Sequence, residues 1–384
     1  MTSTLCTEQQ QPGVPEQIAT RIAFFVSGLG MAAWAPLVPF AKLRLNLDDG
    51  SLGLLLLCIG AGSLLAMPLT GLLTGKLGCR RVILLAGLAL CVDLPLLVLM
   101  DSTPGMGLAL LLFGAAIGMI DVAMNIQAVI VERASGRAMM SGFHGFFSIG
   151  GIAGAGGVSL LMWLGLSPLS AVLTTVLAIA LLLALAQKNL LRDSDAQDDG
   201  PLFVLPRGWV MFLGTLCFIM FLAEGSMLDW SALFLTTLRG VEHSQAGLGY
   251  ALFSIAMTIG RLNGDRVVNA LGRYKILLLG SLCAALGLTL AVACDNAVIA
   301  LLGFMLVGLG ASNVVPILFS AAGNQRDMPA NLAIASVTTL GYAGILAGPA
   351  LIGFIAQVSS LTVAFGCVTA LLLAVAASAK AVTR

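Results

Sequence analysis

The sequence has little charge for its length. Only 10% of its 384 residues are Asp, Glu, Lys or Arg, whereas 59% are hydrophobic and the mean hydropathy is +1.03. A soluble domain carries about 25% charged residues, so this composition excludes an ordinary water-soluble fold. Long runs without charge are instead typical of a chain that crosses lipid as helices.

The residue types that usually support catalysis or metal binding are also scarce. The chain has 2 histidines, far apart in sequence, and its 8 cysteines are scattered singly, without the spacing of a disulfide framework or a metal site. It has no Gly-x-x-x-x-Gly-Lys-Ser/Thr motif, so the sequence shows no phosphate-binding loop for ATP hydrolysis. We therefore expect a protein that is not an enzyme, with no cofactor, no metal and no nucleic-acid partner. The amino end also lacks the basic region and early apolar core of a cleaved signal peptide.

Apolar segments long enough to cross a hydrocarbon core of about 30 Å recur along the whole chain. They predict roughly twelve transmembrane helices, since a helix pairs every backbone polar group internally. The segments lie near 19–40, 52–74, 82–100, 105–131, 141–164, 167–187, 208–236, 246–264, 275–294, 297–320, 330–355 and 358–379.

Positive charge is distributed unevenly between the two sides of these spans. With the amino end inside, only Lys42, Arg44 and Arg239 fall outside, whereas the other loop arginines and lysines, Arg261 among them, fall inside. This is the positive-inside pattern, and it predicts that both termini are cytoplasmic.

The chain also repeats itself at an offset of roughly 190 residues, as transporter repeats do. GLLTGKLGCRR (71–81) corresponds to GRLNGDRVVNALGR (260–273), IGMIDVAMN (117–125) to VGLGASN (307–313), and GGIAGAGG (150–157) to GYAGILAGPA (341–350). The predicted organisation is a tail (1–18), a six-helix half (19–187), a polar cytoplasmic linker (188–207), a second six-helix half (208–379) and a tail (380–384).

A carboxylate and an amide interrupt the fourth predicted span. Asp121 and Asn125 share one helix face with Gly114, Gly118 and Ala128, because these positions step by three or four residues. A carboxylate at mid-span costs about 2.5–3.5 kcal/mol on insertion scales, and such groups almost always face the bundle interior or a watery cavity. We therefore expect this face to line the path of a solute.

The same reasoning selects residues in three other spans. Glu224 lies near mid-depth in the seventh span, with Asp229 and Trp230 nearer its outer end, and Trp34 and Asn313 complete the ring of substrate-binding candidates. Trp230 could stack on a sugar ring while Asp229 accepts its hydroxyl groups. Packing or interface anchoring is an equal alternative for both tryptophans, and a buried interhelical hydrogen bond is one for Asn313.

Two of these acids are also candidates for proton coupling. Asp121 and Glu224 could take up and release a proton as the site opens to either side, because burial favours the uncharged form and water the charged one. The spans as predicted contain no mid-span lysine or arginine, so we expect a neutral solute or a cation and not an anion.

The first of the two repeated loops carries a glycine and charge motif. Its matching residues are Gly71, Lys76, Gly78, Arg80 and Arg81, with Gly75 where an acid is usual. The second copy keeps Asp265 and Arg266, followed at a longer spacing by Gly272 and Arg273. These paired motifs resemble those of the major facilitator superfamily. The resemblance implies an all-α fold of twelve transmembrane helices in two pseudo-symmetric halves, spans one, four, seven and ten around a central site, and these two loops as the cytoplasmic gate.

A narrower resemblance comes from residues 121–151 and 221–235. They are similar to the YbjJ-type and MosC-type branch of bacterial inner-membrane proteins, which hints at sugar-like or inositol-derived cargo. The resulting expectation is a proton-coupled transporter, functional as a monomer in the lipid bilayer, that moves a neutral sugar- or polyol-like solute by rocking residues 15–187 against residues 208–384. Proton-driven efflux of drugs or metabolites and a non-transporting receptor are the alternatives.

Overall fold

The computed structural model describes residues 12–47, 49–192, 206–242 and 247–383. These ranges contain helices and no strand. The predicted tails and linker fall partly outside them. The first set of helices is α1 (Val14–Ala33), the short η1 (Ala35–Leu37), α2 (Val38–Arg44), α3 (Asp49–Leu99), α4 (Thr103–Ser135), α5 (Met140–Trp163) and α6 (Pro168–Ala186). The second set is α7 (Gly208–Arg239), α8 (Leu248–Leu271), α9 (Arg273–Ala293), α10 (Ala297–Ala311), α11 (Val314–Asn324), α12 (Ala330–Val358) and α13 (Leu361–Val382).

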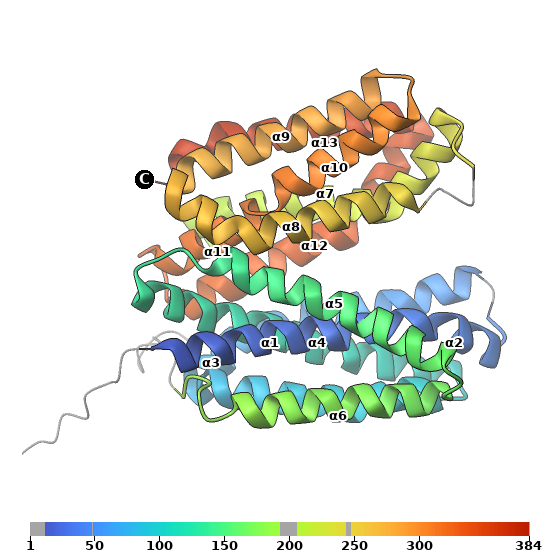
Figure 1. The fold of residues 1–384 in the computed structure, drawn as a ribbon, viewed down its shortest axis with the longest axis vertical. Coiled ribbons are helices and arrows are strands. Elements are labelled where there is room, and N and C mark those ends of the chain that lie inside the picture. The colour runs from blue at the N-terminus through green and yellow to red at the C-terminus, as the bar shows by residue number, and fades with distance from the viewer. Residues whose placement is uncertain (1–11, 48, 193–205, 243–246, 384) are drawn as a thin grey trace, which may run out of the picture.

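The helices account for the twelve predicted spans. Within the described residues, ten helical stretches are long and apolar enough to cross a membrane. One of them, Leu54–Leu99, contains two spans, because α3 bends at Gly78, and α8 is the remaining span. In Figure 1, α1–α6 and α7–α13 form two separate layers of helices, with α5 facing α8. The predicted all-α fold with two halves is confirmed.

Gly78 and Gly272 form equivalent turns in the two halves. Gly78 has φ 78° and ψ 159°, and Gly272 has φ 84° and ψ 153°. A side chain is strained at such positive φ, so glycine is the residue that lets the chain reverse here. The two loops therefore repeat in backbone conformation as well as in sequence.

Glycines also allow the closest helix contacts in each half. Gly150 and Gly154 of α5 lie directly against the backbone of α1, at the carbonyls of Phe25 and Leu29. In the second half, Gly344 of α12 lies in the same way against the carbonyl of Phe218 in α7. Small residues permit this approach in membrane bundles, and the two contacts involve the glycine-rich segments that the sequence paired.

The tenth span is broken at a polar residue. Helix α10 ends at Ala311 and α11 begins at Val314, so Asn313 lies in the break. Pro316 accounts for the break, because its ring excludes the carbonyl of the residue four positions earlier from a regular helix. The sequence thus places an amide side chain at the point where the regular helix is interrupted.

Arg44 and Arg239 occupy equivalent places in the two halves. Arg44, at the end of α2, donates through Nε to the carbonyl of Met100 and through Nη2 to that of Leu97, each at 2.8 Å. Arg239, at the end of α7, donates through Nη2 to the carbonyls of Ala291 and Val292 at 2.7 and 2.9 Å. Both arginines therefore satisfy carbonyls at the C-terminal end of a neighbouring helix, where partial negative charge gathers. This explains two of the three basic residues that depart from the positive-inside pattern.

Candidate functional site

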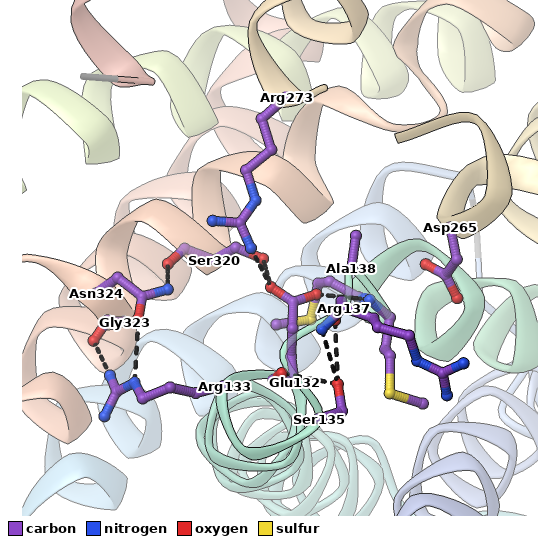
Figure 2. A network of polar contacts seen from close by, with 12 residues as sticks. Glu132, Arg133, Ser135, Arg137, Ala138, Asp265, Arg273, Ser320, Gly323 and Asn324 are labelled. Atoms are coloured by element: carbon purple, nitrogen blue, oxygen red, sulfur yellow. Dashed lines mark hydrogen bonds and ion pairs between the residues drawn. The ribbon is translucent and has the colours of Figure 1, made fainter. Parts of the chain in front are cut away.

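Most of the described hydrogen bonds between the two halves lie at one end of the bundle. We call this end the basic end, and define it by Gly78, Gly272 and the connections 136–139 and 325–329. Glu132, at the end of α4, is only 4% exposed there. Its Oε1 accepts hydrogen bonds from Arg273 Nη2 at 2.9 Å and from the Ser320 hydroxyl at 2.5 Å, both in the second half (Figure 2). Its Oε2 accepts from the backbone N–H groups of Met139 and Met140, each at 2.8 Å.

Further hydrogen bonds cross between the halves beside Glu132. Arg133 donates through Nε to Asn324 Oδ1 at 3.0 Å and through Nη2 to the carbonyl of Gly323 (Figure 2). The Asn269 side chain of α8 accepts from the N–H of Ala138 and donates to its carbonyl. Between described residues, every hydrogen bond that joins the halves lies at the basic end, except one from Arg261 to Ser148.

The two copies of the gate motif make different contacts. Asp265 of the second copy reaches across to α5, where its Oδ1 accepts from the N–H of Gly142 at 3.0 Å. The acid therefore caps the start of a helix in the other half. In the first copy Gly75 replaces the acid. The loop here supplies a backbone acceptor and the opposite half supplies the side chain: Asn331, near the start of α12, donates to the carbonyl of Gly71 at 2.6 Å.

The other gate candidates differ in their surroundings. Lys76, Arg81 and Arg266 are exposed. The N–H of Arg80 donates to the carbonyl of Leu191 in its own half at 2.8 Å. Of the nine gate candidates, the described contacts thus bring Gly71, Asp265 and Arg273 to the opposite half, and their role in gating stays a prediction.

Asp121 is buried near the middle of α4, with 7% of its surface exposed. No described residue donates a hydrogen bond to its carboxylate. Tyr342 of α12 lies within electrostatic range, so this part of α4 faces the second half. The neighbouring Asn125 is fully buried and donates to the backbone carbonyl of Asp121 at 2.8 Å. The glycines on the same face pack on α3, where Ser63 donates to the carbonyl of Gly114.

Glu224 of α7 forms an ion pair with an arginine of α8. Its Oε1 accepts from Arg261 Nη2 of α8 at 3.3 Å, and Arg261 Nη1 donates to the hydroxyl of Ser148 in α5 at 3.2 Å. Arg261 is only 7% exposed. Its assignment to a cytoplasmic loop was therefore wrong, and so was the expectation that the spans hold no buried cation. Both errors have one cause: the predicted eighth span ended too soon after Arg261, whereas α8 continues to Leu271.

Asn313 links the broken tenth span to α8. Its Nδ2 donates to the carbonyl of Gly260 at 3.3 Å and to the hydroxyl of Ser312 at 2.9 Å. The interhelical hydrogen bond that the sequence left as an alternative is present. Its Oδ1 is buried and accepts from no described residue.

The remaining substrate candidates are spread along the bundle. Trp34 is 5% exposed and Trp230 packs against Gly353 of α12, with both indole N–H groups buried and unpartnered among the described residues. Asp229 is exposed. Apart from the bond between Asn125 and Asp121, no hydrogen bond or ion pair of the described residues joins any two of the seven candidates, and their substrate-binding role stays a prediction.

A hollow of about 600 Å³ lies elsewhere, at the basic end of the second half. Trp209, Arg273, Asn324 and Arg326 contribute to its walls. None of the substrate candidates lines it, so it is separate from Asp121 and Glu224.

Two functional candidates could have been recognised from spacing. Arg261 shares a helix face with Met257, Gly264 and Val268, because the steps are three or four residues, and all four are buried. Glu132 follows Ala128 by four residues on the face that carries Asp121 and Asn125. Its partners in the second half, Arg273 and Ser320, in contrast lie more than a hundred residues away and leave no local signal.

Comparison with known proteins agrees with this architecture. The family model of the Major Facilitator Superfamily matches residues 21–327. The chain is 72% identical to an uncharacterized MFS-type transporter of Yersinia pestis, over 100% of both chains. It is 34% identical to the membrane protein MosC of Rhizobium meliloti, over 88% of this chain and 83% of that one.

A solved structure has the same fold. FucP, the fucose:proton symporter of Escherichia coli, matches in its outward conformation with a TM-score of 0.80 and 16% identity, over 97% of this chain and 99% of FucP. Together with the matches in sequence, the fold shows that the chain is a member of the Major Facilitator Superfamily and falls in its MosC-like branch.

Proposed function

We propose that the chain is a proton-coupled secondary transporter that carries a small hydroxylated solute, of the size of a sugar or polyol, across the bacterial inner membrane. The observation that carries this proposal is a pair of acids inside the bundle in opposite halves: Asp121 in α4, which is 7% exposed, and Glu224 in α7, whose side chain is 14% exposed. Buried carboxylates are costly in a membrane protein and mark ion or proton paths.

The arrangement of contacts supports alternating access. The cross-half hydrogen bonds at the basic end close one side, which the charge distribution assigns to the cytoplasm. The halves can then rock about the middle of the bundle when these bonds break. In this proposal both termini are cytoplasmic and the monomer is the working unit.

The class of solute has less support than proton coupling or alternating access. FucP carries fucose with protons, and the fold alone is shared with it. That Trp230 and Asp229 hold a hydroxylated ring stays a prediction. The argument for a neutral solute falls away, however, because it depended on the absence of a buried cation and Arg261 is one.

The test is uptake into proteoliposomes under an imposed pH gradient, with L-fucose, D-xylose, myo-inositol and D-glucuronate as labelled solutes. We expect accumulation of at least one solute by the native chain, and at least a tenfold loss in Asp121→Asn or Glu224→Gln. Asp101→Asn is the matched control, since Asp101 is exposed between α3 and α4. Equal accumulation by all variants would exclude proton coupling through these acids, and no uptake of any solute would favour a receptor.

A further inference from the structure

Arg261 is 7% exposed and lies inside α8, whereas Arg239, whose side chain is 4% exposed, lies at the end of α7. The Arg261 guanidinium bridges the halves, with Nη1 donating to Ser148 of the first half and Nη2 to Glu224 of the second. The Nε–H group is buried and has no partner among the described residues. A guanidinium has five N–H donors, so most of its capacity remains unused.

The ion pair is also loose. Arg261 Nη2 and Glu224 Oε1 are 3.3 Å apart, whereas charge-assisted hydrogen bonds are about 2.7–2.9 Å long. The contact uses one nitrogen and one oxygen, although a guanidinium and a carboxylate can pair through two parallel bonds. Glu224 therefore holds Arg261 less tightly than a bidentate oxyanion from outside could.

We propose that Arg261 binds the carboxylate of a hydroxylated acid, such as a sugar acid, and that Glu224 takes up one proton when it releases Arg261. The inference rests on the proposed function, because it names the substrate class and the proton carrier of the same site.

Charge balance requires the proton. Arg261 and Glu224 together are neutral, so an added carboxylate would leave one negative charge in a medium of low dielectric, which is costly. A proton taken from water on the open side onto a Glu224 oxygen restores neutrality. It returns to water when the carboxylate leaves and Glu224 pairs with Arg261 again. A doubly charged phosphate would need a second neutralising group, which favours a monocarboxylate.

Other titratable groups lie near this pair. His144 of α5 is within electrostatic range of Arg261, and its ring packs between Phe24 and Phe319 at centroid distances of 5.1 and 5.7 Å. Cys217 of α7 is within range of Glu224. From α12, Tyr342 contacts Phe221, one turn before Glu224. Of these groups only Glu224 forms an ion pair with Arg261. Glu224 is therefore the group that loses its cation when Arg261 binds the carboxylate, and we assign the proton to Glu224.

The experiment is binding of D-glucuronate and D-galacturonate to the purified full chain, compared with D-glucose and D-galactose. We expect either acid to raise the melting temperature of the native chain at pH 6 by several degrees more than the corresponding neutral sugar does, because a ligand that binds the folded state stabilises that state. The apparent Kd should rise by up to about tenfold per pH unit as the pH is raised, since one proton binds with each anion. Glu224→Gln should bind the acid at pH 8 at least tenfold more tightly than the native chain, without this pH dependence.

A charge-neutral double variant separates binding from folding. Arg261→Gln alone leaves Glu224, whose side chain is only 14% exposed, without its cation, whereas Arg261→Gln with Glu224→Gln removes both charges. We expect the double variant to melt within a few degrees of the native chain and to lose the response to acids. Arg192→Gln, at an exposed position, is the control.

The inference would be overturned if no acid bound in an Arg261-dependent way, if the double variant responded equally, or if Glu224→Gln retained the pH dependence. Uptake of a neutral sugar without acid binding would also overturn it, while leaving the proposed transport in place. Acid binding with the expected pH dependence but no uptake of any solute would support the site and contradict transport.

Discussion

Glu132 of α4 accepts a hydrogen bond from Arg273 Nη2 at 2.9 Å, across the interface between the halves. The two oxygens of this carboxylate have different partners. Oε1 contacts Arg273 and Ser320 in the second half (Figure 2), whereas Oε2 contacts the N–H groups of Met139 and Met140 in its own half. Opening the basic end must break the hydrogen bonds of Oε1 to Arg273 and Ser320, but it can leave those of Oε2 intact. Glu132 can therefore act as a latch between the halves while its carboxylate stays fixed in the first half.

Glu132→Gln should weaken this latch. The amide keeps the shape but removes the charge that pairs with Arg273, and because Arg273 is 41% exposed we expect a cost of about 1–2 kcal/mol, below that of a fully buried pair. The measurement is the distance distribution between spin labels at Arg137 and Lys275, which should gain a longer component. Glu16→Gln is the control, since Glu16 accepts from Gly13 in its own half. An unchanged distribution in Glu132→Gln would show that the carboxylate does not hold the halves together.

Gly75→Asp should strengthen closure of the basic end. The substitution restores the acid of the first motif copy one turn from Gly71, whose carbonyl accepts from Asn331 near the start of α12. A carboxylate near a helix N-terminus contributes about 0.3–1 kcal/mol. We therefore expect the same spin-label distances to narrow and uptake to slow by roughly two- to fivefold.

The control for this prediction is Gly75→Asn, which has a similar size and no charge. If both substitutions change the distances equally, bulk at position 75 and not charge is responsible. If neither changes them, the first loop does not take part in closure.

The sequence predicted the fold well because its signals are local. The length of the apolar segments, the basic residues of the loops and the repeated motifs around Gly78 and Gly272 can each be recognised from residues that are close together in the sequence. The pairing of Glu224 with Arg261 could not be predicted in this way, because the two residues belong to different helices and their contact depends on helix rotation and tilt. The same holds for Glu132 with Arg273. Arg261 was misplaced because an arginine near a span's edge is usually a loop residue, and only its helix face distinguishes it.

Arg239→Gln should destabilise the second half. Arg239 donates to two carbonyls at the end of α9, lies over the ring of Phe234 at 4.8 Å and pairs with Asp295 at 3.1 Å. Its side chain is 4% exposed. Loss of hydrogen bonds from a buried charged donor costs about 1.5–3 kcal/mol, which should lower the melting temperature by several degrees. Arg44→Gln should have a smaller effect of the same sign, because one of its hydrogen bonds is exposed.

Lys76→Gln, at an exposed position, is the control for both arginines. A melting temperature of Arg239→Gln equal to that of this control would contradict the capping role. Uptake per folded molecule should stay near the native value in both arginine variants, since neither arginine contacts Asp121 or Glu224.

Gly154→Ala should disrupt the first half, whereas Gly156→Ala should not. A β-carbon at position 154 would meet the carbonyl of Leu29, and because that atom belongs to the backbone of α1, the two helices must move apart. Overpacking of this kind costs about 1–3 kcal/mol. A β-carbon at position 156 would have nothing within 4 Å, and alanine in a helix is favoured over glycine by about 0.5–1 kcal/mol. We therefore expect the melting temperature to fall in Gly154→Ala and to stay level or rise in Gly156→Ala. Equal melting temperatures would show that α1 and α5 can separate at little cost, and the two helices would then not act as one rigid unit when the halves rock.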